Sequence, residues 1–161
     1  MTEDSELKSL QGISVVLAST AKWRSDILNQ LGISHICHEH EFDEPYYKSG
    51  DFNKFVEAIA VGKAESLSGK FPDAIIIAAD QLCSIGDKIL YKSGTSEKAV
   101  DQLLALNGQW HELVCAVAVK YGDRMISKVE KASLQMRELS EKEIRSYVKQ
   151  DKPWDCAGSY K

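Results

Sequence analysis

Two acidic side chains lie at positions where a carboxylate could bind a metal ion or activate water. Asp80 follows an unbroken apolar run over 74–78, which predicts a strand buried on both faces of a helix-covered sheet. Open α/β sheets bind ligands outside the carboxyl ends of their strands, so an acid there is well placed to hold a metal ion or to activate water. Glu44 belongs to an acidic segment, 41–44, before Pro45. These residues alone also allow a turn-capping role for Asp80 and a solvated role for Glu44.

Two hydroxyl side chains lie between a predicted strand over 13–18 and a predicted helix over 21–31. Ser19 and Thr20 therefore stand at a helix N-terminus, where free backbone N–H groups and the helix dipole favour an anion. Arg24 adds positive charge. An ordinary N-cap role for Ser19 or Thr20 explains the same pattern. The apolar side of this helix is expected to consist of Trp23, Ile27, Leu28 and Leu31.

Two lysines complete the set of charged candidates. A helix over 51–68, with Asp51 as its N-cap, presents apolar residues at helical spacing, and Lys63 lies within that apolar stripe. Its ammonium group either extends to the surface or points into a cleft. Lys92 follows a hairpin predicted around Gly86. Basic groups and carboxylates gathered at one pocket would suit a triphosphate with bound Mg²⁺.

The segment 33–39 is predicted as a short strand. It contains His35, Cys37 and His38, and His40 follows it directly. Alternation along a strand puts His38 and His40 on one face. It puts His35 and Cys37 on the other face, so these potential zinc ligands diverge. A polar edge strand therefore explains the composition better than a zinc site does.

The composition is that of an ordinary globular protein, and 161 residues suffice for one domain. A net charge of −4 provides no basic field for nucleic acid. The longest apolar run is too short to span a membrane, and residues 1–9 do not resemble a signal peptide, so we expect a cytoplasmic protein. The cysteines form no C-x-x-C pair, which favours mostly buried, reduced thiols. We expect residues 1–12 to form a loose tail and 13–161 the domain.

Eight short segments, taken in order, form a pattern that is more specific than any of them alone. They are Leu17-Ala18-Ser19-Thr20-Ala21-Lys22-Trp23-Arg24, Phe42-Asp43-Glu44, Gly62-Lys63-Ala64, Ala79-Asp80-Gln81, Tyr91-Lys92-Ser93, Gly108-Gln109-Trp110-His111, Glu143-Ile144-Arg145-Ser146-Tyr147-Val148 and Cys156-Ala157-Gly158-Ser159-Tyr160. In these segments the chain resembles the Maf-family nucleoside triphosphate pyrophosphatases. The resemblance extends from residue 13 to the end of the chain.

The resemblance implies a role for each matched residue. Asp80 would activate water or bind a metal ion, and Glu44 would be a second carboxylate at that ion. The cofactor would be Mg²⁺ or Mn²⁺, and attack at the α-phosphate of a nucleoside triphosphate would give the monophosphate and pyrophosphate. Ser19, Arg24, Lys63 and Lys92 would hold the phosphates, and the two lysines would also be catalytic. Thr20 would be a further substrate-binding residue.

Two matched positions resemble one branch of the family. The common family pattern has arginine and threonine where this chain has Trp23 and Gln81. This pair resembles the branch that acts on 7-methyl-GTP. A flat indole suits a cationic methylated purine, through stacking and cation–π attraction. Without the resemblance, Trp23 would be assigned to the core side of its helix.

The implied fold class is α/β and Maf/Ham1-like, with an elongated mixed sheet flanked by helices and two lobes around a cleft. A homodimer is implied as well. The chain departs from the family at Ala21 and Tyr91, and it ends at Lys161, where family members continue. The first hypothesis is therefore a metal-dependent nucleotide pyrophosphatase. The second is a catalytically impaired nucleotide-binding protein of the same fold, and the third is a zinc-binding or scaffold module built on 35–40.

Overall fold

The computed structural model describes residues 12–161, so the expected loose tail lies, apart from Gly12, outside the described residues. The chain divides into two compact units. The first unit holds the described residues up to Tyr46, with Glu57–Asp80 and Ala116–Lys128, and the second unit holds Tyr47–Val56, Gln81–Cys115 and Val129–Lys161. The single domain and the cleft expected from the sequence stay predictions.

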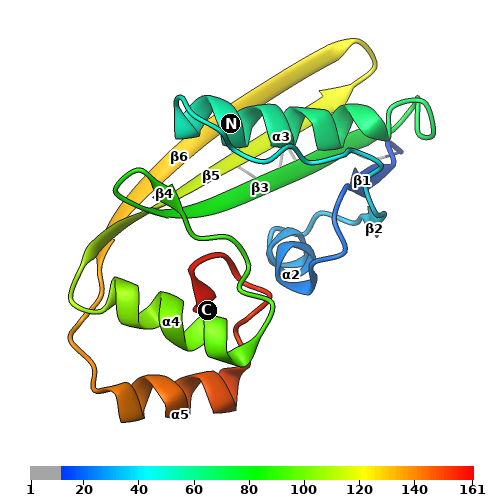
Figure 1. Cartoon of the computed structure of the whole chain (residues 1–161). Coiled ribbons are helices and arrows are strands. Elements are labelled where there is room, and N and C mark those ends of the chain that lie inside the picture. Colours follow the sequence, from blue (N-terminus) through cyan, green and yellow to red (C-terminus); the bar gives the residue numbers. More distant parts are fainter. Residues whose placement is uncertain (1–11) are drawn as a thin grey trace, which may run out of the picture. The chain divides into compact units, whose positions relative to one another are not determined.

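Within residues 12–161, six strands form one mixed sheet, which confirms the predicted α/β class. The strands are β1 (Val15–Leu17), β2 (Ile36–Cys37), β3 (Ile75–Ile85), β4 (Lys88–Ile89), β5 (Trp110–Tyr121) and β6 (Arg124–Gln135). Their order is β2-β1-β3-β5-β6, and β4 pairs with the end of β3 (Figure 1). β1 is parallel to both of its neighbours, whereas β3 and β4 are antiparallel.

β3 differs from the strand predicted at its position. The apolar run predicted an end before Asp80, but β3 continues through Asp80 to Ile85. β1 pairs with β3 only as far as Leu17 and Ile77, so Asp80 still lies beyond the carboxyl end of the parallel part. The prediction that the apolar run is buried on both faces is wrong, because burial alternates over 75–79. The buried face consists of Ala74, Ile76 and Ala78.

Two helices carry candidate residues: α2 (Lys22–Gln30) and α3 (Phe52–Ser66). α2 has nearly the predicted bounds, but only Leu28 of its expected apolar side is buried. In α3, Val56, Ile59, Ala60, Ala64 and Lys63 are buried at helical spacing. The predicted N-cap of α3 is confirmed, because the Asp51 carboxylate accepts a hydrogen bond of 2.8 Å from the Asn53 N–H.

In the second unit, α4 (Ser96–Leu106) and α5 (Glu141–Asp151) lie side by side (Figure 1). Thr95 caps α4, and the capping box predicted at Ser140 and Glu143 is present at the start of α5. The apolar faces of the two helices meet in a small core of Ala99, Val100, Leu103, Ile144 and Val148.

The cysteines are all free thiols, and only Cys83 is fully buried, so the expectation of mostly buried cysteines is wrong. Among the helices of residues 12–161, none combines the length and the apolar character that crossing a bilayer requires.

Candidate functional site

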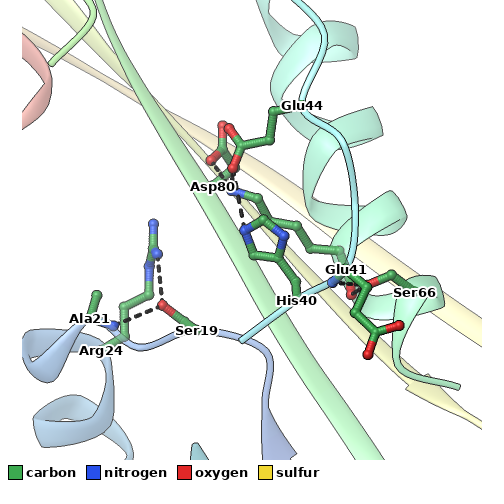
Figure 2. Close-up of polar contacts among 9 residues, drawn as sticks. Ser19, Ala21, Arg24, His40, Glu41, Glu44, Ser66 and Asp80 are labelled. Carbon is green, nitrogen blue, oxygen red and sulfur yellow. Dashed lines mark hydrogen bonds and ion pairs between the residues drawn. The ribbon is translucent and has the colours of Figure 1, made fainter. Parts of the chain in front are cut away.

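An ammonium group bridges two carboxylates in the first unit. Lys63 Nζ lies 2.7 Å from Asp80 Oδ1 and 2.8 Å from Glu44 Oε1 (Figure 2). Asp80 comes from β3 and Lys63 from α3, whereas Glu44 comes from the irregular segment that precedes α3. The Lys63 side chain is only 6% exposed, so it points inward instead of extending to the surface. The fold thus brings together three residues that the sequence singled out separately.

Close packing against α3 holds the acidic segment in place. A Cβ atom at Gly62 would overlap the ring of Phe42, so the glycine allows that ring to lie directly on the helix. On the same helix, Ser66 Oγ accepts a hydrogen bond of 3.1 Å from the Glu41 N–H (Figure 2). These two contacts fix the chain shortly before Glu44 and present its carboxylate to Lys63, the neighbour of Gly62.

Burial sets the protonation behaviour of Asp80. Removal from water disfavours its charged form and raises its pKa, while attraction and a hydrogen bond from Lys63 lower it. Repulsion from Glu44 raises the pKa further, the Arg24 guanidinium opposes this, and the net shift is upward. A carboxylate with a raised pKa accepts a proton more readily than an ordinary aspartate, which suits a general base.

His40 is a member of this cluster that sequence reasoning did not assign to it. Its Nε2 lies 3.3 Å from Glu44 Oε1 (Figure 2). Burial lowers the pKa of His40, and repulsion from Lys63 lowers it further, so the neutral ring is favoured. A histidine before an acidic, irregular segment gives no local sign of this contact, and only the tertiary structure reveals it.

The other histidines of the zinc hypothesis have different contacts. His35 Nε2 lies 2.8 Å from Ser25 Oγ, and the ring of His38 packs edge-on against Phe71. Across residues 12–161, no three His, Cys, Asp or Glu side chains gather where they could hold a metal ion. The hypothesis of a zinc module on 35–40 therefore finds no support in the described chain.

The start of α2 has the character of an anion site. Its N-cap is Ala21, so the alternative that Ser19 or Thr20 serves as an N-cap is wrong. Ser19 Oγ instead accepts hydrogen bonds from the Ala21 N–H at 3.2 Å and from Arg24 Nη1 at 3.1 Å (Figure 2). With both lone pairs engaged, its hydroxyl proton is directed toward a further acceptor. Thr20 is exposed, and the first turn of α2 carries no acid.

The remaining candidates lie at the surface or in the second unit. Trp23 is 50% exposed, so its assignment to the core side of α2 is wrong. The Arg24 guanidinium carbon lies 4.7 Å from the centre of the Trp23 ring and covers one face of it. Gln81, which follows Asp80 in β3, is half-buried, and Lys92 is exposed; both belong to the second unit.

Comparison with known proteins assigns the chain to a family. The model of the Maf-like protein family matches residues 14–161. The chain belongs to the Maf-like protein family. This Maf-like chain is 36% identical to a 7-methyl-GTP pyrophosphatase of Bdellovibrio bacteriovorus over 149 residues, which are 91% of the chain and 78% of that relative. It is 31% identical to a protein of the same name from Pseudomonas savastanoi pv. phaseolicola, over 92% of the chain and 78% of that relative.

The fold of this Maf-like chain also has a counterpart among solved structures. The structure of the Staphylococcus aureus Ham1 protein superposes with a TM-score of 0.51 and 19% sequence identity. The match covers 75% of this chain and 69% of that chain. The likeness confirms the Maf/Ham1-like fold expected from the sequence motifs.

Proposed function

We propose that this chain is a nucleoside triphosphate pyrophosphatase, which hydrolyses its substrate to the monophosphate and pyrophosphate. The observation that carries the proposal is the cluster in which Lys63 bridges Asp80 and Glu44. Membership of the Maf-like family supports the reaction class. A homodimer and a cytoplasmic location, both expected from the sequence, belong to the proposal as well.

Each residue of the first unit has a role that follows from its surroundings. Asp80, with its raised pKa, accepts the proton of the attacking water. Lys63 orients this carboxylate and balances negative charge at the reacting phosphate. The N-terminus of α2, the Ser19 hydroxyl and Arg24 bind phosphate oxygens. The phosphate-binding role of Lys92, which belongs to the second unit, rests on the family resemblance alone.

Asp80 and Glu44 are the residues that would hold a divalent cation. Their hard carboxylate oxygens suit Mg²⁺ or Mn²⁺, and such ions commonly take their other ligands from substrate phosphates and water. The two carboxylates lie on either side of Lys63 Nζ, at 2.7 and 2.8 Å from it, so they are close enough to bind one ion together. When bound, the cation would polarise the phosphate and neutralise its developing charge.

The substrate that we propose is 7-methyl-GTP. Two relatives carry this substrate in their names, and the chain has the Trp23 and Gln81 pair of that branch. The exposed indole of Trp23 provides a flat surface for a cationic purine. Because Arg24 covers one face of the ring, the base would stack on the opposite face.

Pyrophosphate release tests the proposal directly. Wild-type protein is assayed with Mg²⁺ or Mn²⁺ on 7-methyl-GTP, on GTP and on the pyrimidine triphosphates. Asp80→Asn should abolish release but spare nucleotide binding, whereas Asp73→Asn, the same change at an exposed acid, should leave release intact. Preference for 7-methyl-GTP that Trp23→Ala removes would support the base assignment. Equal, negligible release by the wild type and Asp80→Asn would favour the impaired nucleotide-binding protein instead.

A further inference from the structure

The segment that carries Lys92 is held on both sides of the lysine by one set of polar contacts. Before Lys92, the Tyr91 carbonyl oxygen accepts a hydrogen bond of 2.8 Å from Gln102 Nε2. After Lys92, the Ser93 hydroxyl lies 2.9 Å from Ser159 Oγ. Ser159 closes the ring, because its hydroxyl donates to Gln102 Oε1 at 2.7 Å. We name this set, Tyr91, Ser93, Gln102 and Ser159, the Lys92 bracket.

Backbone contacts reinforce the bracket at both ends of the segment. The Gly158 N–H donates to the Leu90 carbonyl oxygen at 3.1 Å, and the Gly94 N–H donates to the Trp154 carbonyl oxygen at 2.8 Å. Residues 90–94 form no helix or strand of their own. Their conformation is therefore set by contacts with α4, with the C-terminal residues 154–159, and with β3, where the Cys83 carbonyl oxygen accepts a hydrogen bond of 2.8 Å from the Leu90 N–H.

Ser159 adopts a backbone conformation that a serine seldom takes. Its φ is +58°, in the left-handed region, and the residue is 0% exposed. Such a conformation costs free energy and persists only where the surroundings enforce it. Ser93 is buried as well, whereas Lys92 between the bracketed residues is exposed. These polar contacts, of which the one between Ser159 and Ser93 is buried, thus present one exposed ammonium group on a fixed piece of backbone.

We propose that Gln102 and Ser159 are positioning residues for Lys92, which they serve by fixing the backbone on either side of it. The inference rests on the proposed function, in which Lys92 contacts the phosphates of the substrate. A lysine side chain has many rotamers and loses conformational entropy when its ammonium group binds phosphate. An unrestrained backbone would lose further conformational entropy in the same step. The bracket removes that backbone freedom before the substrate arrives.

Ser159→Gly tests the bracket with little disturbance of the fold, because glycine adopts a positive φ without strain. We expect faster amide hydrogen exchange in the peptide covering 90–94. We also expect kcat/KM for the triphosphate to fall roughly five- to tenfold, as for one lost hydrogen bond. Ser93→Ala removes the hydroxyl that contacts Ser159 and should give the same two results. This second variant keeps the proposal testable if Ser159→Gly does not fold.

A double-mutant cycle separates positioning from general stabilisation. Lys92→Ala should lower kcat/KM, and Ser159→Gly added to Lys92→Ala should lower it no further, because the residue being positioned is gone. Asn107→Ala is the matched control: Asn107 also makes two hydrogen bonds, to the Leu139 carbonyl oxygen and N–H, away from the segment 90–94. It should lower the melting temperature but leave kcat/KM of the folded protein unchanged.

Four results would count against these proposals: three would overturn the positioning role alone, and the fourth would overturn the proposed function. Unchanged exchange at 90–94 in both bracket variants, or equal losses from Ser159→Gly with and without Lys92, would overturn the positioning role in an active enzyme. A loss in Asn107→Ala as large as in Ser159→Gly would do the same. A folded wild type that releases no pyrophosphate would instead overturn the proposed function, and the role of the bracket with it.

Discussion

Lys63 donates a hydrogen bond of 2.7 Å from Nζ to Asp80 Oδ1, and the same ammonium group pairs with Glu44. Two carboxylates that would repel each other thereby share one buried cation. The arrangement keeps both acids close to the place where the proposed chemistry occurs. It also makes Lys63 responsible for both the charge balance and the geometry of the cluster.

Replacement of Lys63 by methionine should therefore disable the enzyme. We expect kcat/KM to fall at least 100-fold and stability to fall by about 2 kcal/mol, because the Asp80 charge stays buried without its partner. Lys70→Met is the control: Lys70 is 52% exposed and lies 3.8 Å from Glu41, a surface pair of little energetic weight. Pyrophosphate release and thermal unfolding measure the two effects. Full activity of Lys63→Met would contradict the assignment.

The raised pKa of Asp80 predicts how stability depends on pH. A carboxyl whose pKa is raised on folding contributes stability below the ordinary aspartate range and loses it as pH rises through the raised pKa. Asparagine carries no charge at any pH. The melting temperature of Asp80→Asn minus that of the wild type should therefore increase between about pH 4 and about pH 8. Thermal unfolding with a chelator present measures this difference, and a difference that is flat or decreases would refute the prediction.

Gly62→Ala should damage the site although alanine favours helices. The new methyl group would meet the ring of Phe42 and displace the segment that carries Glu44. We expect kcat/KM to fall at least tenfold, in spite of a gain in helix propensity of about 1 kcal/mol. Phe42→Ala in the same protein removes the clash and should restore part of the loss. Without such coupling between the two changes, the packing argument would fail.

Cysteine reactivity should follow burial. Burial raises the pKa of Cys83 to about 11, so few of its thiols are ionised near neutral pH, whereas Cys37 is exposed. Iodoacetamide should modify Cys37 of the native protein and leave Cys83 intact, and both should react in denaturant. Mass spectrometry of the alkylated peptides measures the order. Rapid modification of Cys83 in the native protein would show that the packing around it opens readily.

Features that depend on neighbouring residues could be predicted from the amino-acid sequence alone. The capping box at Ser140 and Glu143 and the hairpin around Gly86 are both present, because capping and turn preferences act within a few residues. The ordered motifs pointed to the Maf-like family, to which the chain belongs. Asp80, Glu44 and Lys63 were identified by residue type and motif, although not as contacts of one another.

The direction in which those side chains point depends on contacts between distant parts of the chain, which the sequence did not reveal. Lys63 and Asp80 are 17 residues apart, and their contact depends on how α3 packs against β3. Packing also continued β3 through Asp80, left Trp23 exposed, and brought His40 to Glu44. The physical reason is the sequence separation of the interacting residues. Hydrophobic periodicity and turn preferences depend on nearby residues, whereas an ion pair between separate elements forms only when tertiary packing brings those elements together.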